Sequence, residues 1–511
     1  MAVTQIPNEL IEFGVKTFGT SSIMLGDTTT GTIDAANYNT GVGVDVFASL
    51  TSGDLNTAFG YQALSGNTSG GTQTAIGSRT LVNSTGNDNT AVGDYSQNSN
   101  TTGGQNVSVG KQSLSSNTTA SNNTAIGHSA LHLNTTGIEN VAVGANALDA
   151  NTTGNYNIAI GKDALGVQTG GTYNIAIGKN SSAAITTANS NVAVGYNSLS
   201  TNVAADRNTA LGMQCLQTMS SATTADTNNT GVGFQAGLLM TTATNNTCVG
   251  SKALRDATTG SINTAIGVSA MENCTTGGQN VAVGRALWVG TLTGSNNVAV
   301  GLDAGKNVTS GSGNVFVGKD TGTGTDALTT GNNCIYIGNA AAGNATSTCE
   351  FVIGVGDIGV GGNSVTIGKD TTNRIYNTFL TTATWTRSSD ERLKKDIQTN
   401  TDCGLDFIND LRTTTYKWKA PSEIPTDFDA YDADVTEAEH SDKLYGFIAQ
   451  EVKQALDDNN ITDFTGWHTD DATGIQGISY EMFVVPLVKA VQELSAKNDA
   501  LEARIATLEG E

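Results

Sequence analysis

One short stretch of the chain holds side chains that could carry out covalent chemistry. It reads "RSSDERLKKDI" (387–397), and from Ser389 to Asp396 every residue except Leu393 is a serine or is charged. A serine hydroxyl becomes a good nucleophile only when a base removes its proton. A lysine amine can be that base only when it is neutral, and burial is what lowers a lysine pKa from its usual value of about 10.4. Taken alone, the same pattern is also typical of an exposed, charged turn.

The stretch marks a change in composition along the chain. The first 389 residues are rich in Asn, Thr, Gly, Ala and Val and have a net charge of −7, whereas the last 122 residues have a net charge of −15. The whole chain of 511 residues carries −22, so it repels phosphate backbones and we expect no nucleic-acid partner. No proline occurs between Pro7 and Pro421, which favours continuous backbone pairing over a disordered linker.

A 17-residue repeat occupies most of the region before the stretch. For example, "NVAVGANALDANTTGNY" (140–156) is followed directly by "NIAIGKDALGVQTGGTY" (157–173). Between Asn106 and Asn314, a single step of 21 residues, from Asn208 to Asn229, interrupts the 17-residue spacing. Self-similarity at a fixed period is typical of solenoid proteins, in which each repeat is one structural unit stacked on the next.

Each repeat begins with a pentad that has a constant pattern. In 16 copies the second residue is Thr, Val or Ile, the third is small in all but Phe316, the fourth is large and apolar, and the fifth is Gly. This alternation predicts a short strand whose large side chains are buried, with a small residue on the opposite face where another chain approaches closely. The "NTTG" segment predicts a turn with left-handed Asn and Gly, and a pair such as Ala147–Leu148 predicts the return strand.

These pentads and turns resemble the β-roll head repeats of trimeric autotransporter adhesins, and similar repeats occur in phage tail fibres. The resemblance covers roughly half of the chain. It implies three parallel chains, each a left-handed parallel β-roll solenoid, packed about a common axis. The expected fold class is therefore mostly β, followed by a small α+β domain that ends in a coiled-coil helix.

The residues after Asp390 predict that second domain. "LYGFIAQEVKQALDD" predicts a strand end that leads into a helix, and "SYEMFVVPLVKAVQELSAKNDALEARIATLEGE" predicts one long helix. A heptad seam runs along the long helix, with Asn498 at an a position, a device that fixes register in coiled coils. The seam favours self-association over docking on the helix's own domain, and it consists of Val484, Leu487, Val491, Leu494, Asn498, Leu501, Ile505 and Leu508.

Three motifs, "SDERLKKDI", "YGFIAQEV" and "SYEMFVVPLVKAVQEL", carry a second resemblance. Together they resemble the C-terminal intramolecular chaperone of endosialidase-type phage tailspikes and fibres, a self-cleaving domain that also occurs in the myelin regulatory factor family. The resemblance implies that Ser389 is the nucleophile, that Lys394 is the base, and that the chain is cut between Ser389 and Asp390. The residues it implies as structural support are Gly446, Gln450 and Glu451.

The combined expectation is a homotrimeric viral tail fibre for host attachment. Its partners would be phage tail or baseplate proteins at the N-terminus and a glycan or protein receptor on the host surface. It would be made in the host cytoplasm and located in the virion, without insertion in a membrane. The expected parts are an N-terminal attachment segment (1–50), a β-roll rod (51–338), a distal region (339–389) and a C-terminal chaperone with self-cleaving peptidase activity (390–511).

Two other functions remain as alternatives. A bacterial trimeric surface adhesin could use the same rod, but we expect neither a signal peptide nor a C-terminal membrane anchor. A tailspike depolymerase acting on host glycan would need paired carboxylates, which are not recognisable in the rod. The cysteines and histidines have no ligand spacing, so we expect no metal and no cofactor.

The receptor surface is expected where the repeat period breaks. The two candidate stretches are 213–228 and 339–388, since binding residues are often held on loops by a regular scaffold. Trp288, Tyr336 and Trp385 could be exposed contact residues, or they could pack locally at breaks in the repeat.

Overall fold

The computed structural model consists of two units, Met1–Ser388 and Ser389–Glu511. It describes residues 14–18, 20–26, 35–220, 225–288, 291–323, 328–343, 345–356, 358–378, 386–387, 389–426, 428, 431–438, 443–470 and 474–510. Much of the expected N-terminal attachment segment (1–50), and Trp385, therefore lie outside the described residues.

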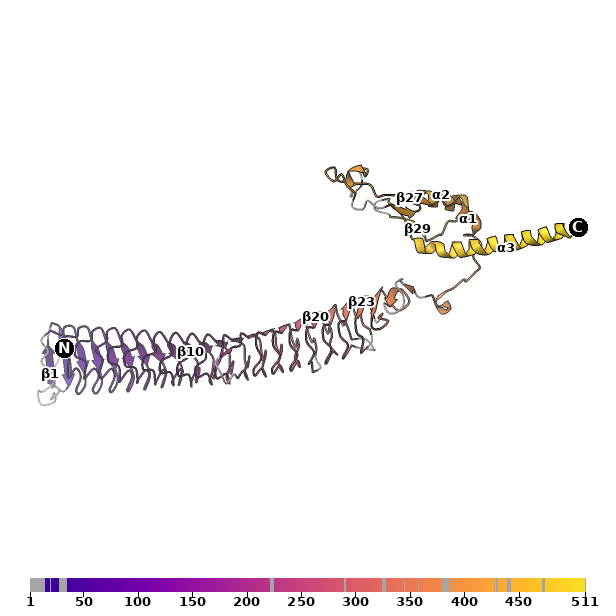
Figure 1. Ribbon diagram of the computed structural model, residues 1–511. Helices are drawn as coiled ribbons and strands as arrows, with labels where there is room; N and C mark the ends of the chain where they lie inside the picture. The colour runs from indigo at the N-terminus through magenta and orange to yellow at the C-terminus, as the bar shows by residue number, and fades with distance from the viewer. Residues whose placement is uncertain are drawn as a thin grey trace, which may run out of the picture. The chain divides into compact units, whose positions relative to one another are not determined.

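The first unit is a β-solenoid, in which one short strand per coil stacks on the next (Figure 1). Each strand pairs in parallel with its neighbour in equivalent register, so that Ala142 faces Ala159 and Ala159 faces Ala176. The strands of this stack are β3 (Thr40–Val42), β4 (Thr57–Phe59), β5 (Thr74–Ile76), β6 (Thr90–Val92), β7 (Val107–Val109), β8 (Thr124–Ile126), β9 (Val141–Val143), β10 (Ile158–Ile160), β11 (Ile175–Ile177), β12 (Val192–Val194), β14 (Thr209–Leu211), β16 (Thr230–Val232), β17 (Thr247–Val249), β18 (Thr264–Ile266), β19 (Val281–Val283), β20 (Val298–Val300), β21 (Val315–Val317), β22 (Ile335–Ile337), β23 (Glu350–Gly354) and β24 (Ser364–Gly368).

Antiparallel strands lie at both ends of this stack. At the start, β1 (Gly14–Phe18) pairs with β2 (Ser22–Gly26), which then pairs in parallel with β3. At the other end, β25 (Arg374–Thr378) pairs with β24 and with β26 (Thr386–Arg387). These hairpins occupy strand edges that would otherwise be open to pairing with other chains.

The small third residue of the pentad faces the interior of its own coil. Ala142 and Ala159 are fully buried in a core that also contains Ala147 and Leu148, whereas Ile160, a fourth residue, is 38% exposed. The expectation that the large strand residues are buried and that the small one meets another chain was therefore wrong. The interior of a coil this short has no room for a second large side chain opposite the leucine.

Changes of size inside the coil compensate for one another, which supports this explanation. Where Phe47 takes the place of the leucine, the strand residue is Gly41, and a Cβ on it would lie 2.9 Å from Phe47 Cε2. Where the strand residue is Phe316, glycines surround its ring: a Cβ on Gly322 would lie 2.6 Å from Phe316 Cε1, and one on Gly305 would lie 2.9 Å from Cδ2.

The segment that returns from the strand is a run of turns and not the expected second strand. Asn146 and Leu148 have left-handed backbones with φ of 57° and 54°. The segment still bonds to the next coil, since Leu148 N donates to Ala164 O at 2.9 Å. The prediction of left-handed residues in the "NTTG" turn was also wrong, because the left-handed residue is Tyr156, which follows that turn, with φ of 59°.

The first residue of the pentad forms a buried asparagine ladder. Asn157 N donates to Asn140 Oδ1 at 2.9 Å, and Asn157 Nδ2 donates to Gly171 O at 2.9 Å. The pattern repeats from coil to coil, and a second ladder uses the turn asparagines, where Asn151 Nδ2 donates to Asn134 Oδ1 at 2.8 Å. Buried amides need such partners, so the first ladder explains why nearly every repeat has Asn at the first pentad position. The second ladder is limited to coils that have Asn in the turn, because the equivalent residue is Ile185 or Met219 in later coils.

The second unit is a small α+β domain. Phe407, Val452, Leu456 and Phe483 form the centre of its core. Among the described residues, no helix combines the length and the apolar character needed to cross a membrane. In this second unit the strands form two antiparallel pairs, β27–β28 and β29–β30. The elements of the unit are η2 (Glu391–Leu393), α1 (Leu405–Asp410), β27 (Thr414–Tyr416), η3 (Pro421–Glu423), β28 (Leu444–Gly446), α2 (Ala449–Asp458), β29 (Trp467–Thr469), β30 (Gln476–Ile478), η4 (Tyr480–Phe483) and α3 (Val484–Glu509).

Candidate functional site

Ser389 and Lys394, the expected nucleophile and base, lie within hydrogen-bonding distance. Lys394 Nζ donates to Ser389 Oγ at 2.7 Å. The single turn of η2 between them brings the two side chains together, and the side chain of Asp390 caps that turn by accepting from Arg392 N at 2.9 Å. After the turn Lys394 is extended again, with φ of −115° and ψ of 148°.

The carboxylate of Asp390 is bound by Arg392. The guanidinium contacts both carboxylate oxygens, with Nε–Oδ1 at 3.0 Å and Nη2–Oδ2 at 2.7 Å. These hydrogen bonds from Arg392 lower the pKa of Asp390 below its ordinary value. A carboxylate beside a lysine would favour the charged amine, so the arginine directs this charge away from Lys394. Arg392 was not among the site residues predicted from the sequence, because an i,i+2 spacing is not one at which side chains ordinarily pair.

Residues 389–397 are open to solvent in the single chain. Ser389, Asp390 and Lys394 are exposed, and so are the apolar side chains of Leu393 (53%) and Ile397 (62%). In the observed hydrogen bond the amine is the donor, whereas a general base must accept the serine proton. The pair is therefore assembled, but it has none of the burial that would favour a neutral amine.

The three expected support residues lie around the start of α2. A Cβ on Gly446 would lie 2.3 Å from Tyr480 Oη, so only glycine leaves room for that tyrosine, which accepts from Phe447 N at 3.1 Å. Glu451 is paired with Arg412, with Nε–Oε2 at 2.9 Å, and this contact lowers the pKa of the glutamate.

Gln450 is exposed in the first turn of α2 and lines an apolar groove. The groove has a volume of about 670 Å³, and its walls include Tyr416, Trp418, Phe447 and Tyr480. The alternation of aromatic residues in "TTTYKWKA" was a signal for this surface, but the segment was predicted only as a strand.

Helix α3 both packs on its own domain and exposes its seam. Ala490 is buried, and Glu493 Oε2 accepts from Leu405 N at 2.7 Å, so one face of the helix is docked. Asn498 lies on the exposed side and donates to Glu502 Oε1 at 3.0 Å. The apolar seam residues are all exposed: Val484, Leu487, Val491, Leu494, Leu501, Ile505 and Leu508.

The expected contact residues of the rod are packed inside it. Trp288 and Tyr336 are fully buried, which confirms the interpretation of local packing for both. The buried cysteines have a similar structural setting, and burial raises the pKa of Cys215 and of Cys274 to about 12. Among the described residues, no group of three His, Cys, Asp or Glu side chains could hold a metal ion.

The period break at 213–228 leaves the main sheet continuous. β14 and β16 pair across it, and within the break β15 (Ala225–Asp226) pairs in parallel with β13 (Ala205–Asp206) of the preceding coil. An ion pair joins this addition to the rod, with Arg207 Nη1 2.5 Å from Asp226 Oδ2.

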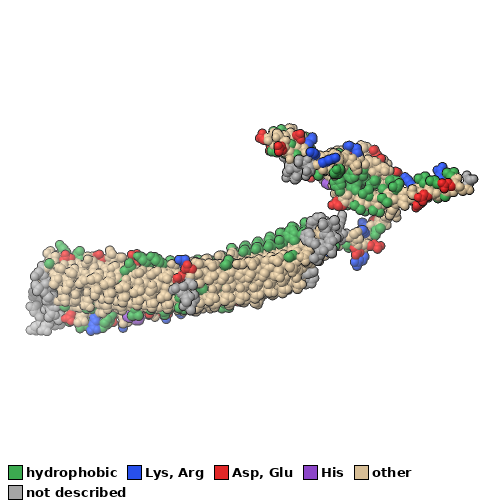
Figure 2. Space-filling view, in the orientation of Figure 1, with side chains coloured by type: hydrophobic (Ala, Val, Ile, Leu, Met, Phe, Trp, Pro, Cys, Tyr) green, Lys and Arg blue, Asp and Glu red, His purple; other side chains and the backbone are tan. Residues whose placement is uncertain are grey.

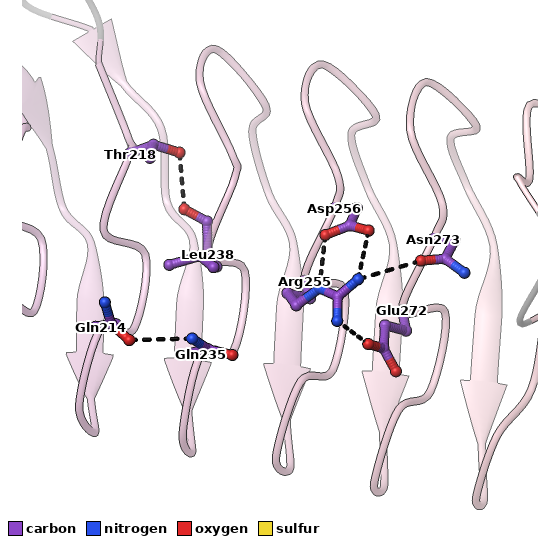
Figure 3. Close-up of polar contacts among 8 residues, drawn as sticks. All are labelled: Gln214, Thr218, Gln235, Leu238, Arg255, Asp256, Glu272 and Asn273. Atoms are coloured by element: carbon purple, nitrogen blue, oxygen red, sulfur yellow. Dashed lines mark hydrogen bonds and ion pairs between the residues drawn. The ribbon is translucent and has the colours of Figure 1, made fainter.

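Polar side chains continue along the coils that follow the break (Figure 3). Gln235 Nε2 donates to Gln214 Oε1 at 3.0 Å, and two coils connect through this contact. Further along, Arg255 binds Asp256, with Nη2–Oδ2 at 2.7 Å, and is also paired with Glu272 (Figure 3). Regular coils carry few charges, so the group of Arg255, Asp256 and Glu272 is a chemically distinct patch. It lies outside the two stretches expected to bind the receptor, 213–228 and 339–388, and the role of those stretches stays a prediction.

Comparison with known protein families identifies the second unit. Residues 389–461 match the family described as chaperone of endosialidase. The chain thus carries this domain behind a β-solenoid, and the match begins at Ser389 itself. Comparisons with curated proteins and with solved structures give no match.

Proposed function

We propose that the chain is the subunit of a homotrimeric viral tail fibre that attaches a phage particle to its host cell. One observation carries the proposal: a chaperone-of-endosialidase domain begins at Ser389, directly after a β-solenoid. A long stack of near-identical coils can pair out of register, so a domain that aligns the copies has a clear use in this molecule.

Two apolar surfaces support self-association. The fourth pentad residues form an outer apolar stripe along the rod, and Figure 2 shows hydrophobic side chains in a line over the strands near β20 to β23. The second surface is the exposed seam of α3. Continuous apolar surface of this kind is typical of interfaces. The stripe includes Phe59, Ile76, Ile126, Ile160, Ile177, Ile266, Val283, Val300, Val317 and Ile337.

In this proposal the second unit cuts itself off when assembly is complete. Lys394 takes the Ser389 proton, and within the trimer Ser389 Oγ attacks the carbonyl carbon of a bond between residues 389 and 390. The nitrogen of Asp390 leaves with a proton, and water hydrolyses the resulting ester. Burial of the stretch by neighbouring chains favours the neutral lysine, so that cleavage follows assembly.

The two binding functions are assigned to parts of the chain that lie outside the regular repeats. The N-terminal segment (1–50) binds the phage tail or baseplate, and the receptor surface lies at 213–228 or in the distal region. Replacing both of these stretches by regular repeats should abolish adsorption to host cells while the trimer remains. Unchanged adsorption would locate the receptor surface elsewhere.

A cleavage series tests the proposed function. Wild-type chain should give fragments 1–389 and 390–511 in a denaturing mass measurement, and native mass should give a trimer of the larger fragment. Ser389→Ala and Lys394→Ala should give trimers of uncut chain. Lys395→Ala is the matched control, because this lysine is adjacent and exposed, and it should cleave like wild type. A stable uncut monomer of the wild-type chain would refute the proposal.

A further inference from the structure

We infer that the serine which cuts each chain comes from a neighbouring copy: Ser389 of one chain attacks the 389–390 bond of the next. The inference rests on the proposed function, because it concerns the same cleavage and the same trimer. It adds a partner to the reaction, since the substrate of each site would be a second copy of this chain.

The first reason is the covalent distance within one residue. Ser389 Oγ is joined to its own carbonyl carbon through Cβ and Cα only. Attack within the residue would close a four-membered ring, in which every bond angle is forced far from its preferred value. Attack on the same carbonyl of another chain closes no ring and can follow the ordinary line of approach.

The second reason is that the nucleophile and the base are complete within one chain, while their surroundings are not. Lys394 Nζ lies 2.7 Å from Ser389 Oγ, and Arg392 keeps the Asp390 carboxylate engaged beside them. Ser389 and Lys394 are nevertheless exposed. A second chain can therefore reach the hydroxyl, and its arrival would supply both the carbonyl and the burial.

The third reason is that the same stretch offers contacts for another copy. Leu393 and Ile397, on either side of Lys394 in the sequence, are both more than half exposed. In a parallel trimer joined through the seam of α3, equivalent residues of the three chains lie at equal heights around the axis. Each stretch then faces the equivalent stretch of its neighbour, and the three reactions can proceed around the ring.

The reaction balances without any further reactant than water. The Ser389 proton moves to Lys394 of the same chain, and an O–C bond forms to the carbonyl carbon of residue 389 in the neighbour. The C–N bond to the neighbour's Asp390 breaks, and the lysine returns its proton to that nitrogen. Water then hydrolyses the ester, which restores the hydroxyl and leaves a free carboxylate at residue 389 of the neighbour.

Mixed trimers test the inference. Wild-type chains and Ser389→Ala chains with different N-terminal tags are produced together, and trimers that carry both tags are isolated. The expected result is that Ser389→Ala chains are cut between residues 389 and 390 in mixed trimers. They should stay intact in trimers that contain only Ser389→Ala chains. A second mixture combines Ser389→Ala chains with Lys394→Ala chains. Here both should stay uncut, because the base serves the hydroxyl of its own chain.

Two results would overturn the inference. One is that Ser389→Ala chains stay intact in mixed trimers in which the wild-type chains are cut. The other is a larger fragment that ends at residue 388, because Ser389 can attack the preceding carbonyl of its own chain without a strained ring. Failure of the proposed function looks different, since wild-type trimers would then not be cut at all.

Discussion

At the scale of single residues, the stretch 389–394 gives its acidic and basic side chains separate partners. Arg392 binds the Asp390 carboxylate through both oxygens, while the amine of Lys394 points to the Ser389 hydroxyl. A lysine that bonded a carboxylate would be held in its charged form and could not accept a proton. The arginine is thus a positioning residue for the proposed base, although it makes no contact with the reacting atoms.

This arrangement predicts that Arg392→Ala slows self-cleavage. Without the guanidinium, Asp390 becomes free to pair with Lys394, and a larger share of the lysine stays charged. We expect a rate at least about 10-fold lower, corresponding to about 1.4 kcal/mol, and a pH profile displaced to higher pH. The rate is measured from the appearance of fragment 390–511. Arg392→Lys should restore much of the rate, and an unchanged rate and profile in Arg392→Ala would contradict the role.

At the scale of the coil, the sequence predicted the repeat, the strand and the solenoid, but it assigned the two strand faces in reverse. Alternation alone does not say which face is inside, and the large residues were placed there by analogy with ordinary half-buried strands. The interior of this coil is instead filled by Leu148 and its equivalents, which leaves space only for Ala142 on the strand. The left-handed turns and the asparagine ladders depend on contacts between coils, which no single repeat reveals.

The two faces of β10 give a matched pair of variants. Ala159→Asp places an unpaired carboxylate in the core, which costs several kcal/mol, so the coil should unfold locally and become sensitive to protease. Ile160→Asp changes a side chain on the outer stripe, so the coil should stay folded while trimers become weaker. Limited proteolysis and native mass separate these outcomes. If Ile160→Asp trimers were as stable as wild-type trimers, the outer stripe would not be part of the interface.

Glycine at the fifth pentad position has a second testable consequence. Gly161 has φ of 132°, and a Cβ there would lie 2.6 Å from the backbone of Gly178. Gly161→Ala should therefore destabilise the rod by about 2 kcal/mol or more. Gly166 in the same coil is the control, since its nearest contact to an added Cβ is an ordinary 3.4 Å. Gly166→Ala should leave the thermal unfolding midpoint within about a degree of the wild-type value or raise it. An equal decrease of the midpoint in both variants would contradict this account.

At the scale of the whole molecule, the proposed function gives the long solenoid and the small domain different parts of one assembly problem. Coils of equal length stack equally well one step out of register, so three rods have many nearly equivalent ways to pair. The α3 seam contains the single polar residue Asn498, which in the proposed trimer would favour one alignment of the helices. Removal of this unit afterwards would leave a fibre that cannot easily come apart.

A gene that lacks residues 390–511 should therefore give insoluble or misassembled rods. The rod itself is unchanged by this deletion, so the expected defect is one of register and not of coil stability. Light scattering and native mass would detect it, with Ser389→Ala full-length chain as the control that keeps the domain attached. Regular trimers from the truncated gene would show that the rod aligns itself without the C-terminal unit.

The central claim is that the C-terminal unit joins three chains first and cuts itself off afterwards. Native mass spectrometry during synthesis tests this order most directly, because it resolves uncut monomer, uncut trimer and cut trimer in one sample. The account predicts that uncut trimers accumulate first. Trimers of fragment 1–389 should appear later, as the uncut trimers disappear. Fragment 1–389 appearing as a monomer before any trimer forms would contradict it.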